Sequence, residues 1–212
     1  MSRLALIDYG SGNLRSAEKA LVRAAGGTVE IRVTHAPEEV LAADRIVLPG
    51  VGAFAACMTA LEGRPGLRDA LDEAVRGRGR PFLGICVGMQ LMASRGLEFG
   101  ETPGLGWIPG EVRRLQPADP AAKVPHMGWN DLVDPHGPPL IAGIGAAPMY
   151  FTHSFAFWPD DRADVAAEAD HGGRFPAAVV RDNMAGVQFH PEKSQSAGIS
   201  LLSRFLEWRP CT

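Results

Sequence analysis

The sequence predicts an α/β fold with a mostly parallel central sheet flanked by helices and an added antiparallel sheet portion. In the first ninety residues, short apolar runs alternate with segments of helical periodicity, and Gly or Pro-Gly closes most of them. Such alternation is typical of βαβ units, whose parallel strands are covered on both faces. Between about residues 107 and 190 strand-like segments dominate instead.

The expected elements of the first half follow one another closely. Residues 3–8 form a strand that ends in a turn, and apolar residues at helical spacing from Leu14 to Ala24 predict a helix that stops at Gly26-Gly27. The other expected elements are strands over residues 28–33, 45–48 and 81–85 and an amphipathic helix over residues 67–75.

The second half is expected to contain strands over residues 107–115, 127–133, 149–157, 165–168, 177–181 and 185–189. Turn signals separate these strands. A closing helix is expected over residues 197–208, with an apolar face that includes Leu202 and Phe205. Because nothing between the halves has the composition of a linker, we expect a single domain over residues 1–212.

Composition excludes several classes of protein. The 212 residues are 46% hydrophobic and 21% charged, as in a globular protein rather than a disordered or collagen-like chain. The net charge of −3 argues against bulk-charge binding of nucleic acid, and no apolar run is long enough to span a membrane. Asp8 interrupts the only N-terminal apolar stretch, so we expect no export signal. The number of cysteines is odd (Cys57, Cys86 and Cys211), which argues against a disulfide framework. We therefore expect a protein of the reducing cytoplasm.

The segment Gly84-Ile85-Cys86-Val87-Gly88 has the spacing of a nucleophile elbow with sulfur in place of oxygen. A sharp strand-to-helix turn strains its central residue, and close neighbours must then lack side chains. The thiol would lie at a helix start that favours thiolate, and the Val87 amide would face an oxyanion. The alternative is a buried cysteine beside two packing glycines.

A thiolate nucleophile needs a base that a third group orients. His190 ends an apolar strand, and Pro191 favours an extended conformation there, so Glu192 is expected to project to the same side. The alternative is a strand-end histidine beside a surface glutamate. Found in one chain with the Cys86 elbow, the pair favours a cysteine–histidine–carboxylate triad.

Other site types have weaker support. Gly50-Val51-Gly52 follows a short strand and could supply a second oxyanion donor, or could be an ordinary tight turn. The Gly10-Ser11-Gly12 loop lacks the third glycine of a dinucleotide site and the lysine of a Walker motif. No pattern of metal ligands occurs, so we expect neither a metal nor a cofactor.

With these segments in place, the chain resembles the class I (triad) glutamine amidotransferases, and within them the glutaminase subunits of imidazole glycerol phosphate synthases. The Gly-Ile-Cys-Val-Gly and His-Pro-Glu segments are typical of the superfamily, and the His-Met-Gly-Trp-Asn and Glu-Lys-Ser segments narrow the likeness. The resemblance covers nearly the whole chain, through residues 8–16, 48–54, 83–91, 104–106, 125–130, 150–154 and 186–194.

The resemblance implies a class I glutaminase fold and roles for individual residues. Cys86 would attack the side-chain amide of glutamine, His190 would move the proton, and Glu192 would orient His190. Stabilisation of the oxyanion is implied for Gly50, Val51, Gly52 and Val87, and contacts with glutamine for Gly52, Gln90, Glu98, Ser154 and Phe155. Phe155 departs from the tyrosine usual at its position, which leaves only a backbone role there.

The resemblance also implies a partner. The ammonia would pass to a (β/α)₈ cyclase, which this chain is too short to contain and which must be a separate protein. Asn13, Trp129 and Lys193 match positions at that interface. The alternatives are a glutaminase subunit of another synthase, such as one making pyridoxal phosphate or anthranilate, a stand-alone cysteine hydrolase, and a non-catalytic binding module.

Overall fold

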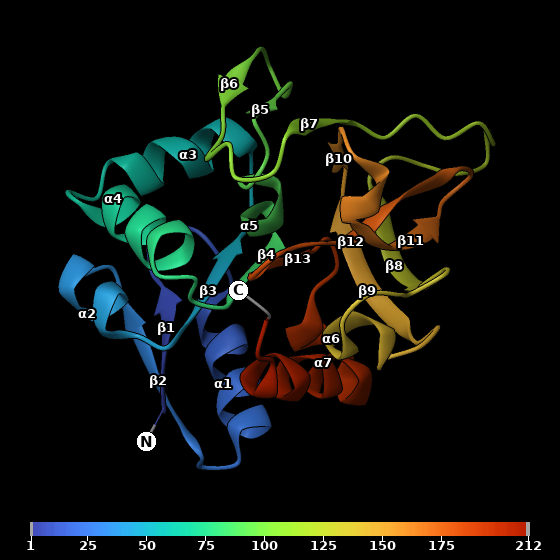
Figure 1. Cartoon of the computed structure of the whole chain (residues 1–212). Coiled ribbons are helices and arrows are strands. Elements are labelled where there is room, and N and C mark those ends of the chain that lie inside the picture. The colour runs from blue at the N-terminus through green and yellow to red at the C-terminus, as the bar shows by residue number, and fades with distance from the viewer. Residues whose placement is uncertain (1, 211–212) are drawn as a thin grey trace.

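A seven-stranded sheet forms the centre of the protein (Figure 1). The structure is a computed structural model that describes residues 2–210. Its strand order is β11-β12-β13-β4-β3-β1-β2. Strands β2, β1, β3, β4 and β13 run parallel, whereas β12 and β11 continue the sheet antiparallel, which confirms the predicted fold class. The strands are β1 (Ser2–Ile7), β2 (Val29–Thr34), β3 (Arg45–Gly50), β4 (Phe82–Cys86), β11 (Val165–Asp170), β12 (Arg174–Arg181) and β13 (Met184–Val187).

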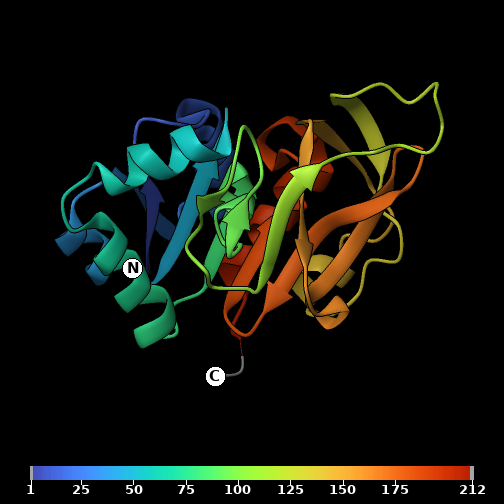
Figure 2. The same cartoon turned by 90° about the horizontal axis from the view of Figure 1, so that it is seen from above.

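Helices cover both faces of this sheet. Helix α1 (Leu14–Ala25) packs beside α7 (Gln195–Glu207) on one face, and α2 (Pro37–Ala42), α3 (Phe54–Glu62) and α4 (Leu67–Asp72) lie on the other (Figures 1 and 2). Strands β4 and β13 are therefore buried along their whole length.

Two of these helices were not predicted. Helix α2 has only six residues and buries one apolar side chain, Val40, so it carries little periodic signal. Helix α3 buries Phe54, Cys57, Met58 and Leu61, a spacing that would have identified it. The predicted helix over residues 67–75 is present as α4, which continues as a π-helical turn over Glu73–Gly77.

The antiparallel part lies beside the parallel part (Figure 2). One sheet has the order β10-β7-β5-β6, and β8 pairs with β9 in a second. The bounds are β5 (Arg95–Gly96), β6 (Thr102–Pro103), β7 (Gly110–Arg114), β8 (His126–Asp131), β9 (Pro148–His153) and β10 (Phe155–Pro159), with a short helix α6 (Pro139–Ala142) between β8 and β9.

Two predicted strands differ from the observed ones. The strand expected over residues 149–157 is two strands, because the chain leaves β8 after β9 and pairs with β7 from Phe155 onward. The strand expected over residues 107–115 is shorter, because the backbone amides of Trp107 and Ile108 both donate to the Met92 carbonyl and hold that stretch as a loop.

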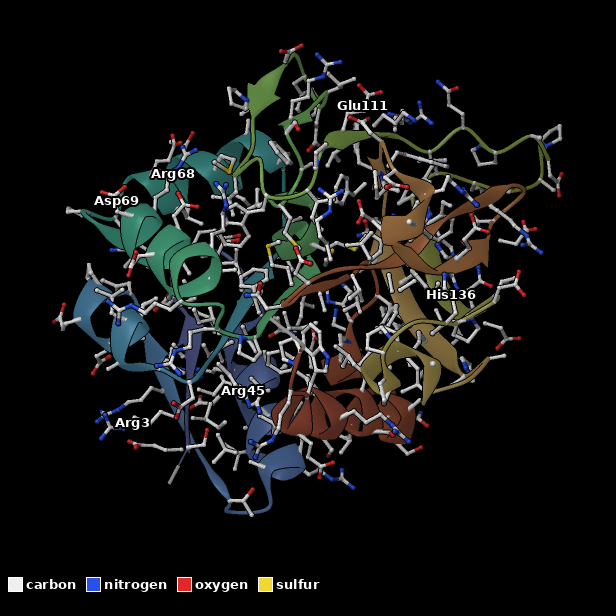
Figure 3. All side chains as sticks on the ribbon, viewed as in Figure 1. Arg3, Arg45, Arg68, Asp69, Glu111 and His136 are labelled. Carbon is white, nitrogen blue, oxygen red and sulfur yellow. The ribbon has the colours of Figure 1, made fainter. Side chains whose placement is uncertain are left out.

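Most charged side chains lie at the periphery, as the labelled Arg68, Asp69 and Glu111 show (Figure 3). Arg45 is an exception, since its guanidinium donates to the Trp208 carbonyl at 2.7 Å and ties β3 to the end of α7. Within residues 2–210, no helix has the length and apolar character needed to cross a membrane.

The carboxyl ends of β3, β4 and β13 meet at one edge of the sheet. Gly50 lies opposite Cys86 in the β3–β4 register, and Val187 lies opposite Ile85 in the β13–β4 register. Residues that follow these strands therefore gather at the same edge. In open α/β sheets, this edge is where ligand sites form.

Candidate active site

Cys86 ends β4 in a strained conformation, with φ 54° and ψ −112°. The two flanking glycines make this turn possible. A Cβ atom at Gly84 would lie 2.6 Å from the Gly88 carbonyl oxygen, and one at Gly88 would lie 1.8 Å from the Leu48 carbonyl oxygen. The backbone is thus packed too closely for any side chain at either position, which is the steric reason for the Gly-x-Cys-x-Gly spacing.

The helix that follows Cys86 is short. Helix α5 (Val87–Gln90) has a single turn, after which the chain bends away and the Ser94 amide joins the Gly110 carbonyl. A macrodipole needs several aligned peptide units, so its effect on the thiol is small here.

His190 and Glu192 form a buried pair in which Nδ1 and Oε1 are 2.8 Å apart. Both side chains are almost fully buried. The backbone of His190 is fixed, because its amide donates to the Tyr150 carbonyl at 2.9 Å and its carbonyl accepts from the Ser194 hydroxyl at 2.6 Å. The pair meets through a 3-10 turn, Pro191–Lys193, rather than through the strand alternation expected from the sequence.

The surroundings of His190 favour its charged form. Burial opposes the charge, but an ionised Cys86 and the Glu192 carboxylate outweigh it and raise the pKa of His190 to about 9. Its Nε2 atom is buried and has no hydrogen-bond partner within residues 2–210. This nitrogen remains available to exchange a proton with Cys86 or with a bound molecule.

A cleft of about 480 Å³ opens over these residues. It brings together most of the residues singled out in the sequence, and it also includes Thr152 and His153, which the sequence analysis had not assigned to a site. Its other lining residues are Asn13, Val51, Gly52, Cys86, Val87, Gln90, Glu98, Ser154, Phe155, His190 and Lys193.

Three of the expected residues lie outside the lining of the cleft. Glu192 is buried behind His190, which it contacts through Nδ1. Gly50 sits beneath the cleft, where an added Cβ would meet the Tyr9 hydroxyl at 2.7 Å. Trp129 is half-exposed on β8 and packs edge-on against Tyr150, with 6.0 Å between ring centroids. The Tyr150 ring also lies 5.5 Å from Lys193 Nζ, so Trp129 and Lys193 belong to one continuous surface at the cleft mouth.

The Phe155 carbonyl is fully used within the protein. It accepts from Gln90 Nε2 and from His153 Nδ1, each at 2.9 Å, which occupies both of its lone pairs. Glu98 is also engaged, since its Oε2 accepts from the Phe54 amide at the start of α3 at 2.8 Å. Phe155 therefore cannot use its carbonyl for a ligand, whereas the second carboxylate oxygen of Glu98 has no hydrogen bond from the residues that the structure describes.

The histidine beside the cleft is held neutral. His153 donates through Nδ1 to the Phe155 carbonyl, so its Nε2 accepts from His126 Nδ1 at 3.1 Å. Burial is the main cause that lowers the pKa of His153 to about 3 and that of His126 to about 4. Both histidines are buried.

In the loop after β3, the peptide groups of Val51 are held by the side chain of Ser11, for which the sequence predicted no role. The Ser11 hydroxyl donates to the Val51 carbonyl at 2.6 Å, and the Val51 amide donates to the same oxygen of Ser11 at 3.4 Å. Cys57 Sγ donates to the Val51 carbonyl at 3.5 Å. The Val51 N–H is therefore committed to Ser11 rather than directed into the cleft.

The elbow, the buried His190–Glu192 pair and the surrounding cleft define a class of enzyme. The family profile described as Glutamine amidotransferase class-I matches residues 5–208, and the chain belongs to this family. Among solved structures, one described as a glutamine amidotransferase has a TM-score of 0.73 at 20% identity and covers 96% of this chain and 97% of its own. A Trypanosoma brucei CTPS glutaminase domain with bound acivicin has a TM-score of 0.63 at 16% identity, covering 100% of this chain and 96% of its own.

Relatives with higher sequence identity indicate which kind of glutamine amidotransferase this chain resembles. The imidazole glycerol phosphate synthase subunit HisH of Caulobacter vibrioides is 59% identical, covering 99% of this chain and 100% of its own length. The protein of the same name from Zymomonas mobilis is 56% identical, covering 99% of this chain and 97% of its own length.

Proposed function

We propose that this protein is the glutaminase subunit of an imidazole glycerol phosphate synthase. It hydrolyses L-glutamine to glutamate and ammonia and passes the ammonia to a separate (β/α)₈ cyclase subunit. The cyclase makes imidazole glycerol phosphate and an aminoimidazole carboxamide ribonucleotide in histidine biosynthesis. The observation that carries this proposal is the strained Cys86 beside the buried His190–Glu192 pair, in a chain 59% identical to a HisH subunit over its full length.

The triad residues divide the chemistry between them. The Cys86 thiolate attacks the amide carbon of glutamine and forms a tetrahedral oxyanion, to which the Val87 N–H donates. His190 gives its proton to the leaving nitrogen, so ammonia departs and a glutamyl thioester remains. Neutral His190 then takes a proton from water, which attacks the thioester and releases glutamate and the thiolate. Glu192 holds the ring in position through the 2.8 Å contact with Nδ1.

The cleft offers groups for the ends of glutamine. The free oxygen of Glu98 and the Gln90 amide oxygen would accept from the substrate's ammonium and amide groups, and Gly52 and Ser154 provide backbone contacts along the wall. For Phe155, its backbone N–H and its side chain remain for a contact with glutamine, since its carbonyl is occupied.

The cyclase would dock over the cleft mouth. Asn13 and Lys193 line the mouth, and Trp129 and Met127 expose large apolar side chains two residues apart on β8. Exposed aromatic residues at such a surface are typical anchors of an interface. We place the complex in the cytoplasm, because an odd set of three cysteines suits a reducing compartment.

One assay tests this function against its alternatives. Glutamate release from glutamine is measured for the protein alone, with the cyclase subunit of an imidazole glycerol phosphate synthase, and with the partner of another glutamine-dependent synthase. We expect strong release only with the first partner. Full turnover alone would support a stand-alone hydrolase, a response only to the other partner would support another synthase, and no turnover in any arm would support a binding module.

We expect a glutamine analogue with an electrophilic carbon to label Cys86 selectively. Cys57 is buried, does not line the cleft, and has its pKa raised, chiefly by burial, so it should be spared. Cys211 lies outside the described residues and is also expected to be spared. Peptide mapping after brief treatment measures the labelling, and even labelling of the three cysteines would mean that Cys86 has no special activation.

Replacing Glu192 by Gln should lower turnover by roughly 10²-fold, a smaller loss than for Cys86→Ala. The amide keeps an acceptor for Nδ1 but removes the negative charge that helps to raise the pKa of His190 to about 9. The imidazolium is then lost at lower pH, so the alkaline limb of the kcat/KM profile should move to lower pH. An unchanged alkaline limb would show that the Glu192 charge does not act on His190.

A further inference from the structure

A chain of buried amides reaches the sulfur of Cys86. Gln188 follows β13 directly and is fully buried, with its backbone amide donating to the Ala177 carbonyl at 2.9 Å. Its side-chain Nε2 lies 3.6 Å from Cys86 Sγ, within range of a hydrogen bond to sulfur. Its Oε1 lies 3.0 Å from Gln90 Nε2.

The orientation of both amides follows from one backbone carbonyl. The Phe155 carbonyl can only accept, so the atom of Gln90 that lies 2.9 Å from it must be the nitrogen. The second hydrogen of that nitrogen points to Gln188, which must therefore present its oxygen to Gln90. Gln188 then has only its NH₂ group left for Cys86. A reversed Gln188 would place two donors against each other.

We propose that Gln188 is a further catalytic residue, whose side-chain amide donates a hydrogen bond to the Cys86 thiolate, and that Gln90 is the positioning residue that orients it. This inference rests on the proposed function, in which Cys86 is the nucleophile. It also accounts for a fully buried polar side chain at the point where the core meets the reacting sulfur.

The chemical need for this donor follows from the short helix. Because α5 has a single turn, its dipole contributes little, and thiolate must be stabilised by neighbouring groups. His190 supplies the positive charge on one side, and the Gln188 N–H supplies a neutral donor on another. A donor to an ionised acceptor belongs to the stronger class of hydrogen bonds, and in a buried site it is not replaced by water. The same contact favours departure of the thiolate when the thioester is hydrolysed.

The test measures the ionisation of Cys86 directly. Alkylation by iodoacetamide is followed between about pH 5 and pH 10 by peptide mass spectrometry, which separates Cys86 from Cys57 and Cys211. In Gln188→Leu, which keeps a similar volume, we expect the midpoint for Cys86 to rise by about one pH unit. The rate below both midpoints should fall roughly tenfold. Gln90→Leu should shift the midpoint in the same direction by less, since it only removes the group that orients Gln188.

A matched control separates this effect from disturbed packing. Val187→Ala changes the buried neighbour whose side chain points to the other face of β13, and it should leave the midpoint unchanged. Thermal unfolding verifies that each variant is folded. An unchanged midpoint in folded Gln188→Leu, or an equal shift in Val187→Ala, would overturn the proposal. Because alkylation needs neither glutamine nor a partner, this outcome is distinct from any failure of the glutaminase assay.

Discussion

Cys86→Ala is expected to abolish glutamine-dependent synthesis by the assembled complex and to leave ammonia-dependent synthesis intact. The substitution removes only the sulfur that attacks glutamine, so glutamate release should fall by at least about 10³-fold. Ammonium salt supplied from solution bypasses this step, because cyclisation takes place on the other subunit. Both rates are measured on the same preparation, with glutamine or ammonium chloride as the nitrogen source.

The ammonia-dependent rate also serves as the control for folding and assembly. Alanine has the same backbone preferences as cysteine at φ 54°, so the turn keeps its strain, and the residue is buried enough to leave the surface unchanged. Glutamate release near the wild-type rate in Cys86→Ala would refute the nucleophile assignment. Loss of both activities would instead point to a damaged complex, and thermal unfolding would then identify the cause.

The fold was predictable from the sequence because the features that set it are local. Apolar runs closed by glycine marked β1, β3 and β4, and the spacing of Gly84, Cys86 and Gly88 reflects contacts made within one turn and with the adjacent strand. The change of partner between β9 and β10 was not predictable, since nothing near Ser154 in the sequence signals a second sheet.

The sequence did not predict side-chain contacts between residues that lie far apart in the chain. Gln188 lies two residues before His190, a spacing that would place both side chains on one side of an extended segment, and this signal was present in the sequence. Its contact with Gln90, 98 residues away, could only be seen once the strands were placed. The same holds for Ser11, which reaches Val51 across 40 residues because β1 and β3 are neighbours in the sheet.

The position of Ser11 bears on how hydrolysis is restrained. A trans peptide directs its N–H and C=O to opposite sides, and the Val51 carbonyl points to Ser11 and Cys57. The preceding peptide directs its own N–H to Ser11 as well. In this conformation the Gly50–Val51 peptide cannot donate to an oxyanion in the cleft. Gly52, at φ 105°, is a residue that lets the adjoining peptides turn at low steric cost.

We therefore expect the free subunit to hydrolyse glutamine slowly, and the complex with bound cyclase ligand to be faster by about 10²–10³-fold. Loss or gain of one oxyanion donor has this magnitude. The partner would select the donating orientation through contacts that differ between the two states.

Ser11→Ala removes the hydroxyl that holds Val51, so it should raise the rate of the free subunit and reduce the stimulation. Gly52→Val should blunt the stimulation by opposing the turn. Turnover is compared for the free subunit, the complex, and the complex with cyclase ligand. Equal turnover in all three would eliminate the switch, and an unchanged ratio in Ser11→Ala would remove Ser11 from it.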